Sequence, residues 1–298
     1  MNKGIWYAIG AYACWGLFPL YWKMLHGVPA LQLIGHRIVW SCVFMILIIT
    51  WIKQWKPFYK SALSLRVLSI YGAAALLVGI NWLTYVWAVN AGHIVETSLG
   101  YFINPLLSVL MGVIFLRERL RLWQWISIAL TAAGVLYLTV AFGSLTWIAL
   151  TLAFSFAFYG FVKKIAPLGS LYGLTMETGI LLVPATIFLL LTNKAGTGAF
   201  LHTDLLSDML MIGSGLVTTI PLLLFASAAK RIPLSVIGIL QYIAPTIQFL
   251  IGVLVYRESF TVAQFVGYGT VWLALILFGM DSFAAYRRSV RRVEEELI

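Results

Sequence analysis

The stretch Phe102–Glu118, FINPLLSVLMGVIFLRE, returns later in the chain as Tyr242–Glu258, YIAPTIQFLIGVLVYRE. The two align without a gap at an offset of 140 residues, and 7 of the 17 aligned positions are identical. Apolar segments often look alike by composition, but a proline, a glycine and an Arg-Glu pair held in one register indicate an internal repeat. The same offset joins four further pairs, namely Phe18/Phe158, Lys23/Lys163, Ala88/Ala228 and Gln124/Gln264. The chain therefore divides into two copies, residues 1–142 and 143–298.

The composition is that of an integral membrane protein. Of the 298 residues 62% are hydrophobic and only 10% are charged, and the mean hydropathy is +0.96. Soluble globular proteins carry about 25% charged residues, so this chain cannot cover a water-facing surface. A net charge of +10 in a soluble chain would suggest nucleic acid, but here the basic residues lie in short loops between apolar runs. We expect the lipid bilayer as a partner, no nucleic acid, no cofactor and no metal.

A helix needs about 20 apolar residues to cross a bilayer. By this measure the chain holds ten spans, five in each copy. They cover residues 4–22, 32–52, 68–89, 94–116, 123–141, 144–162, 171–191, 209–229, 235–256 and 262–280. The first shows no small-residue cleavage site, which indicates a retained helix rather than a signal peptide. The predicted fold is all-α, with ten transmembrane helices.

Basic residues predict how these spans are oriented, because loops rich in Lys and Arg stay in the cytoplasm. With the N-terminus inside, 16 of the 20 basic residues fall on the inner side, three on the outer side, and Arg37 inside a span. Both termini are therefore expected in the cytoplasm. Because each copy holds an odd number of spans, the second copy enters the membrane from the side opposite to the first. Such inverted five-helix repeats are typical of secondary transporters, in which the two halves exchange inward-open and outward-open states.

Polar side chains inside apolar spans are costly and are the first candidates for function. Kinks expected at Pro105, Pro221 and Pro245 free backbone carbonyls and make room for a cavity near the midplane. The expected substrate-cavity residues are Asn81, Tyr85, Tyr101, Asn104, Thr218, Gln241 and Tyr242. The amides could equally join helices by hydrogen bonds, and aromatic residues in a bundle are often packing residues.

Three ionisable residues, Arg37, Glu96 and Glu177, are expected to act as gating or coupling groups. Arg37 and Glu96 share an outer layer, and a pair between them would serve either a gate or helix packing alone. Glu177 lies in an inner layer with no evident cationic partner. It is a candidate proton-binding group, and the alternative is a neutral acid hydrogen-bonded to its helix. Glu118 and Glu258 stand beside arginines at span ends and are expected to be interfacial caps.

Signatures of catalysis are missing from the sequence. It contains no HExxH, no GxSxG and no phosphate-binding GxxxxGK[ST] loop. We therefore expect no enzyme, and any pumping must use an ion gradient because no nucleotide-binding domain is evident.

Six stretches resemble a known family. They are WGLFPLYWK (15–23), GHRIVWS (35–41), ETSLGYFINPLLSVLMG (96–112), GLTMETGILLVP (173–184), TTIPLLLFASAAKR (218–231) and LQYIAPTIQF (240–249). Together with the five-plus-five plan they resemble the EamA-type transporters of the drug/metabolite transporter superfamily, in particular the RarD branch. The resemblance implies a multi-pass secondary transporter of the bacterial inner membrane. It also implies a central cavity lined by spans 1–4 and 6–9, with spans 5 and 10 outside.

From these observations we expect an exporter of a small metabolite or drug-like solute that works by alternating access of the two repeats. Protons are the candidate coupling ion. The alternative is a membrane sensor or scaffold that keeps a transporter fold without transporting.

Overall fold

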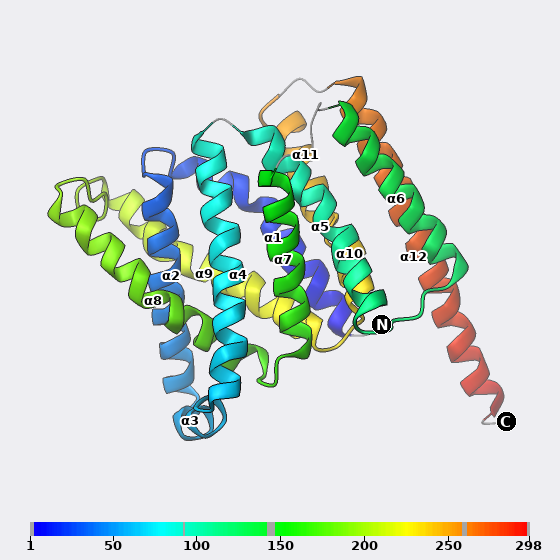
Figure 1. Ribbon diagram of the computed structural model, residues 1–298, viewed down its shortest axis with the longest axis horizontal. Helices are drawn as coiled ribbons and strands as arrows, with labels where there is room; N and C mark the ends of the chain where they lie inside the picture. Colours follow the sequence, from blue (N-terminus) through cyan, green and yellow to red (C-terminus); the bar gives the residue numbers. More distant parts are fainter. Residues whose placement is uncertain (1–2, 92, 142–146, 258–260, 297–298) are drawn as a thin grey trace.

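The computed structural model describes residues 3–91, 93–141, 147–257 and 261–296. Within these ranges every regular element is an α-helix (Figure 1). The helices are α1 Lys3–Met24, α2 Ala30–Trp51, α3 Trp55–Ala62, α4 Leu65–Asn90, α5 Ile94–Ile114, α6 Leu122–Ala141, α7 Trp147–Ile165, α8 Ser170–Lys194, α9 Leu205–Ala229, α10 Leu234–Leu240, α11 Ile243–Leu254 and α12 Val262–Glu296. The predicted all-α membrane fold is confirmed.

Nine spans among the described residues are long and apolar enough to cross a membrane, with α10 and α11 counted as one. The 22-residue helix α1 is long enough, but it is not among the nine. Its glycines, tyrosines and lysines lower its hydropathy, and it packs against α9 and α11 inside the bundle. Counting α1, the structure agrees with the predicted ten spans. The short helix α3, which lies in a predicted inner loop, was not expected.

The repeat is visible in the backbone as well as in the sequence. Arg117 and Arg257, which are 140 positions apart, follow the fourth span of their repeats with left-handed φ angles of 54° and 53°. The next helix of each repeat begins with the same cap: Gln124 Oε1 accepts from the Arg121 N–H at 2.9 Å, and Gln264 Oε1 accepts from the Thr261 N–H at 2.8 Å. The two halves therefore leave one span and enter the next in the same way.

The halves are inverted relative to each other. In Figure 1, α5 descends from the upper edge, whereas its counterparts α10 and α11 rise from the lower edge. The last spans of the two repeats, α6 and α12, pack on each other at one side of the bundle, as the resemblance implied. The predicted repeat boundary at residues 142 and 143 and the predicted cap Glu258 lie outside the described residues.

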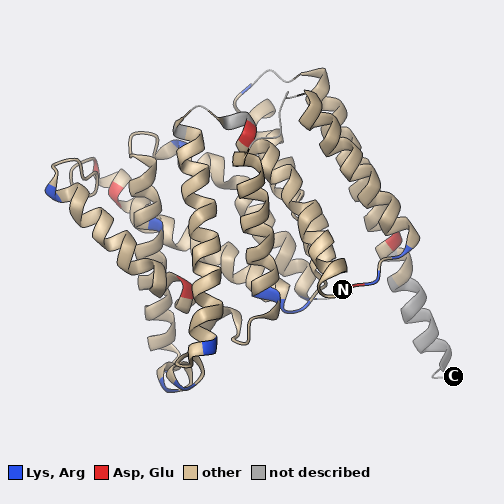
Figure 2. Ribbon diagram, in the orientation of Figure 1, with Lys and Arg blue, Asp and Glu red and all other residues tan. Residues whose placement is uncertain are grey.

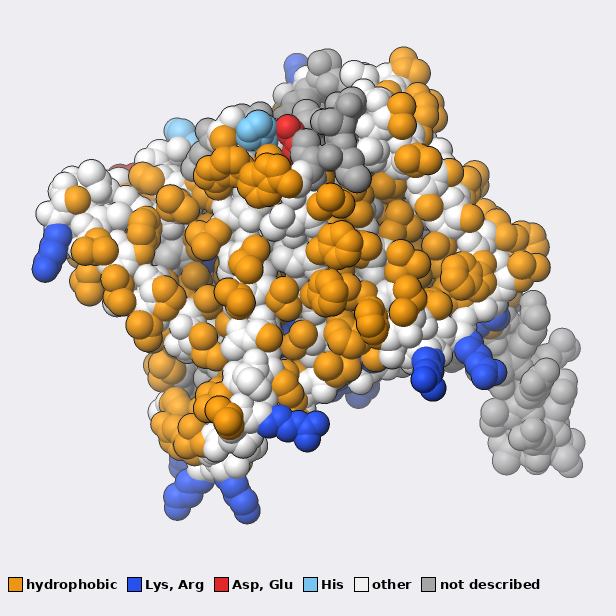
Figure 3. All heavy atoms as spheres, in the orientation of Figure 1, with side chains coloured by type: hydrophobic (Ala, Val, Ile, Leu, Met, Phe, Trp, Pro, Cys, Tyr) orange, Lys and Arg blue, Asp and Glu red, His pale blue; other side chains and the backbone are white. Residues whose placement is uncertain are grey.

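The two edges of the bundle differ in charge. The described ends of the chain lie at the same edge, which we call the termini edge, and most of the blue Lys and Arg ribbon lies there (Figure 2). Between the edges, hydrophobic side chains cover the visible face of the protein (Figure 3). An apolar girdle with a basic edge is what a multi-pass membrane protein requires.

The two edges also differ in packing. A large buried cluster joins the two repeats near the termini edge, because it combines the first half of α1, the end of α9 and all of α10 with facing parts of α4 and α7. Its members that are wholly buried include Ala8, Ala11, Tyr12, Ala157, Tyr159, Ala228 and Leu234. Smaller buried clusters lie toward both edges, one around α3 and the start of α4 and others toward the opposite edge. Among the described residues, the packing that joins the two repeats is thus most extensive toward the termini edge.

Candidate functional site

The side chain of Arg37 is the centre of a polar and aromatic cluster between the repeats. Arg37 lies in the second turn of α2, and its Nε donates a hydrogen bond to Thr218 Oγ1 of α9 at 2.9 Å. Its guanidinium carbon lies 4.8 Å from the ring centre of Trp22, 4.7 Å from that of Trp82 and 5.9 Å from that of Phe18. These aromatic faces stabilise the charge by cation–π interaction.

Two tyrosines from α4 and α5 complete this cluster. Tyr85 and Tyr101 lie with their ring centres 5.7 Å apart, and Tyr85 is one helical turn from Trp82, whose ring contacts the Arg37 guanidinium. Tyr85 is 38% exposed and lies in the last two turns of α4. We call this set the Arg37 cluster; its members are Phe18, Trp22, Arg37, Trp82, Tyr85, Tyr101 and Thr218. Three of the predicted cavity residues, Tyr85, Tyr101 and Thr218, thus lie together around a predicted gating residue.

A second ionic group lies toward the termini edge. Lys163 Nζ of α7 donates to Glu177 Oε1 of α8 at 2.6 Å, and Tyr159 Oη donates to Glu177 Oε2 at 2.9 Å. The lysine is 3% exposed and the glutamate 2%. We call these three residues the Glu177 site. The expectation that Glu177 has no cationic partner is wrong: Lys163, at the end of its span, reaches it across the short turn between α7 and α8.

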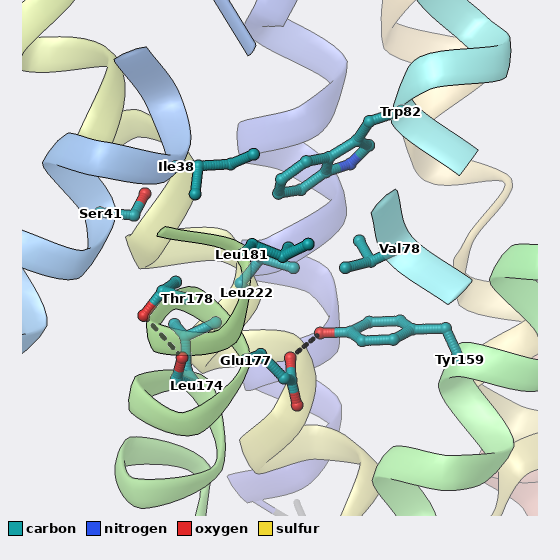
Figure 4. Close-up of a pocket in the computed structure, with 10 residues that line it drawn as sticks. All are labelled: Ile38, Ser41, Val78, Trp82, Tyr159, Leu174, Glu177, Thr178, Leu181 and Leu222. Atoms are coloured by element: carbon teal, nitrogen blue, oxygen red, sulfur yellow. Dashed lines mark hydrogen bonds between the residues drawn. The ribbon is translucent and has the colours of Figure 1, made fainter. Parts of the chain in front are cut away.

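A small cavity adjoins the Glu177 site (Figure 4). Its volume is about 10 Å³, which is roughly the space that one water molecule needs. Figure 4 shows Glu177 and Tyr159 on one side of it and Trp82 on another. Trp82 therefore lies between this cavity and Arg37, whose guanidinium it also contacts.

Arg37 and Glu177 are counterparts under the repeat, since the offset of 140 relates them. The small cavity lies close to the axis between the repeats, because it is lined by both members of three repeat-related pairs, Ile38/Thr178, Ser41/Leu181 and Trp82/Leu222. The same position in the two repeats thus holds, among the described residues, a cation without an acidic partner in one half and a member of a buried ion pair in the other.

The remaining predicted cavity residues join helices in this structure. Asn81 Nδ2 donates to the Leu152 carbonyl and to Ser155 Oγ, both at 3.0 Å, and so ties α4 to α7. Gln241 Nε2 donates to Asn104 Oδ1 at 2.6 Å, and Asn104 Nδ2 donates to the Ala153 carbonyl at 2.9 Å. These bonds link three helices across the two repeats. A direct role in substrate binding for these amides remains a prediction.

Tyr242 marks the axis between the repeats. Its hydroxyl donates to the carbonyl of Phe102 at 2.8 Å, and Phe102 is the residue of the first repeat that corresponds to Tyr242. A contact between two equivalent residues must lie close to the axis that relates them. Of the predicted kink residues, Pro105 lies inside α5 and Pro221 inside α9. The break between α10 and α11 comes just before Pro245.

Two of the predicted charge contacts have different outcomes. No ion pair joins Arg37 and Glu96 in the described part of the chain, because Glu96 Oε1 lies 3.0 Å from His93 Nδ1 at the start of α5. Glu118 is a cap as predicted, but of a helix in the other repeat. It accepts from the backbone N–H groups of Leu234 and Ser235 at 2.6 and 2.9 Å, at the beginning of α10.

Sequence reasoning missed Lys163 and Tyr159 at the Glu177 site, and Trp22 at the Arg37 cluster. Lys163 was counted among the basic residues of an inner loop. A signal was present, since the connection between α7 and α8 is short and Lys163, in the last turn of α7, has a long side chain that can extend toward α8. Trp22 lies in the motif 15–23, one residue before Lys23, and no pattern distinguishes it from an interfacial tryptophan.

The fold and these two sites define a multi-pass membrane protein of the transporter type. The profile of the EamA-like transporter family matches residues 2–140 and again residues 144–280. The chain therefore belongs to the EamA-like transporter family.

Several curated proteins are similar over nearly their whole length. The "Uncharacterized transporter YojE" of Bacillus subtilis (strain 168) is 45% identical, with 93% of each chain covered. "Protein RarD" of Escherichia coli (strain K12) is 40% identical, with 97% of each chain covered. The "Chloramphenicol-sensitive protein RarD" of Pseudomonas aeruginosa is 30% identical, with 98% of each covered. The expected resemblance to the RarD branch is confirmed.

A solved structure described as "Crystal structure of protein" shares the fold. Its TM-score is 0.67 at 16% sequence identity, and the match covers 93% of this chain and 97% of that one. At this identity the likeness supports the architecture alone.

Proposed function

We propose that this chain is a secondary transporter of the bacterial inner membrane, with cytoplasmic termini, that exports a small metabolite or drug-like solute. The Arg37 cluster serves as the substrate site. The two five-helix repeats, 1–142 and 143–298, move against each other so that this site faces each side of the membrane in turn.

One observation supports the proposal: the repeat-related residues Arg37 and Glu177 have different surroundings. Arg37 has no acidic partner among the described residues, whereas Glu177 pairs with Lys163 and accepts from Tyr159, a member of the buried cluster near the termini edge. In an inverted-repeat transporter the two halves adopt different arrangements in each state. With cytoplasmic termini, we propose that the protein is here in an outward-facing state.

The Glu177 site supports proton coupling. While Lys163 and Tyr159 bond to Glu177, both carboxylate oxygens are occupied and the charge is neutralised. When the termini edge opens, water reaches the pair, and the carboxylate becomes accessible to a cytoplasmic proton. A proton on Glu177 would weaken its bond to Lys163 and so link protonation to the position of α8 relative to α7. Ionisable groups inside a membrane bundle commonly serve such relays.

Transport can be tested without knowing the substrate. Proteoliposomes loaded with a bacterial metabolite extract are given a proton gradient, and the released solutes are identified by mass spectrometry. We expect one or a few solutes to leave vesicles that contain the wild-type protein, and to stay inside vesicles that contain Arg37→Gln or Glu177→Gln. The control is Lys60→Gln, which removes one positive charge, as Arg37→Gln does, but from an exposed side chain in α3. Equal release from all four preparations and from empty vesicles would favour a sensor or scaffold.

Substitutions of Asn81, Asn104 and Gln241 would not distinguish a transporter from a scaffold. Because they hold helices together, apolar replacements would destabilise either kind of protein. Arg37 and Tyr101 discriminate better, since a scaffold does not need an accessible charge in its centre.

A further inference from the structure

No acid among the described residues balances the charge of Arg37. Its repeat counterpart Glu177 has Lys163 Nζ at 2.6 Å. Among the described residues, no Asp or Glu oxygen lies within 4.0 Å of the Arg37 guanidinium. An uncompensated charge at this depth is costly. The first repeat therefore holds a cation where the second repeat holds a neutral pair.

The cluster also holds unused hydrogen-bond donors. Arg37 uses its Nε for Thr218, and in the part of the chain that the structure describes its two terminal nitrogens have no hydrogen-bond partner. The same is true of the Tyr85 and Tyr101 hydroxyls. Arg37 and Tyr101 are half-buried, and Tyr85 is 38% exposed. The cluster thus offers hydrogen-bond donors without partners among the described residues, and the bond to Thr218 holds the guanidinium in place.

The aromatic wall limits what the ligand can be. Phe18, Trp22 and Trp82 offer apolar surface, and aromatic rings alone would also attract organic cations. Here the faces of these rings are already turned to Arg37. A second cation at the same place would be repelled by the guanidinium, whereas an anion would complete its charge and hydrogen bonds.

We propose that the Arg37 cluster binds organic anions, in which a carboxylate or phosphate group lies on Arg37, Tyr85 and Tyr101 and an aromatic or other apolar body packs against Trp22 and Trp82. This inference deepens the proposed function and rests on it for its role in transport, because it names the class of solute carried. Binding itself can be measured without transport.

The test uses the purified full-length protein in detergent and a matched set of probes. 3-Phenylpropanoate, 3-phenylpropanamide and 3-phenylpropylamine share a body and differ in charge, and phenyl phosphate replaces the carboxylate by a phosphate. Apparent dissociation constants are obtained from the rise in melting temperature with probe concentration. We expect the carboxylate or the phosphate to bind at least about tenfold more tightly than the amide and the amine, since hydrogen bonds to charged groups are stronger than those to neutral groups.

Variants tie the binding to the cluster. Arg37→Gln should weaken anion binding about tenfold or more, and Tyr101→Phe, which keeps the ring and loses one donor, should weaken it less. Lys60→Gln, at the termini edge, should leave it unchanged. If Arg37→Gln does not fold, Tyr101→Phe decides alone. The inference is overturned if no anion binds, if the amide or the amine binds as tightly, or if neither cluster variant weakens binding.

The two proposals fail in different ways. If the wild-type vesicles release only neutral or cationic solutes, the chain is a transporter and the anion inference is wrong. If the anions bind through Arg37 but no solute is released by any wild-type preparation, the binding site stands and the transporter proposal is wrong.

Discussion

Arg37 and Glu177 occupy the same position in the two repeats, yet among the described residues one is a cation without an acidic partner and the other belongs to a buried ion pair. The helices around them have the same order and the same caps at their ends. What differs is the chemistry of single positions, such as Trp82 against Leu222 and Tyr85 against Phe225. The comparison teaches that repeats with one backbone plan can differ in function through single side chains. In the proposed mechanism, one half supplies charge to a ligand and the other holds a charge pair that separates when the termini edge opens.

The largest expected effect comes from breaking the ion pair of the Glu177 site. Glu177→Leu leaves Lys163 buried without its partner, and we expect a loss of about 3–5 kcal/mol in the free energy of unfolding. The double variant Lys163→Met/Glu177→Leu should recover most of that loss, because an apolar pair can replace a buried ion pair. Denaturation in detergent measures both. A single variant as stable as the wild type would show that the pair is not buried in solution.

The next effect concerns the helix contact that brings Arg37 to Thr218. A Cβ atom on Gly215 would lie 2.6 Å from the backbone of Trp40, so Gly215→Ala must push α9 away from α2. We expect a loss of about 1–3 kcal/mol and weaker anion binding at the Arg37 cluster. Gly72→Ala is the matched control, since its Cβ would meet nothing within 4 Å. Equal stability of the two variants would contradict the close packing of α2 on α9.

A smaller effect is expected at the amide pair between the repeats. Gln241→Leu removes the bond to Asn104 and leaves the Asn104 carbonyl with Ser108 at 3.5 Å as its remaining contact. Hydrogen bonds between membrane helices contribute about 0.6–1.7 kcal/mol, and we expect a loss in that range. Asn104→Ala should lose more, because it also removes the bond to the Ala153 carbonyl. If the double variant loses no more than Asn104→Ala alone, the two residues act as one pair. Additive losses would mean that they act independently.

The smallest effect tests the seal at the termini edge. The Tyr12 hydroxyl is fully enclosed and has no hydrogen-bond partner among the described residues. An unpaired hydroxyl costs free energy only in the state in which it is buried. Tyr12→Phe removes this cost and should therefore stabilise the state with a closed termini edge, relative to the open state, by about 1 kcal/mol. Thiol labelling of Val78→Cys, which lines the closed cavity, should slow several-fold in the Tyr12→Phe background. Faster labelling would mean that the hydroxyl is paired when the edge is closed.

The sequence was sufficient for the architecture because the repeat, the spans and the charge bias are long-range patterns. It was weaker on the sites, where side-chain partners decide the role. In the sequence, Asn81, Asn104 and Gln241 resemble solute-binding residues, but in the structure each donates a hydrogen bond to a neighbouring helix. Glu177 looked unpaired because Lys163 was counted in a loop, although a lysine can extend well beyond its own Cα. Arg37 was recognised as important from its depth, while its aromatic surroundings come from α1 and α4 and could only be seen in three dimensions.

The central claim is that the two repeat-related sites open to opposite sides of the membrane in turn. It can be tested by placing a single cysteine at Tyr101 or at Val78, after replacing Cys14 and Cys42 by serine, and labelling oriented vesicles with a membrane-impermeant thiol reagent from each side. The account predicts that Tyr101→Cys reacts from the side opposite the termini, that Val78→Cys reacts from the side of the termini, and that Lys163→Met/Glu177→Leu changes the balance between the two rates. Reaction of both cysteines from the same side only, or no reaction of Val78→Cys at any pH, would contradict it.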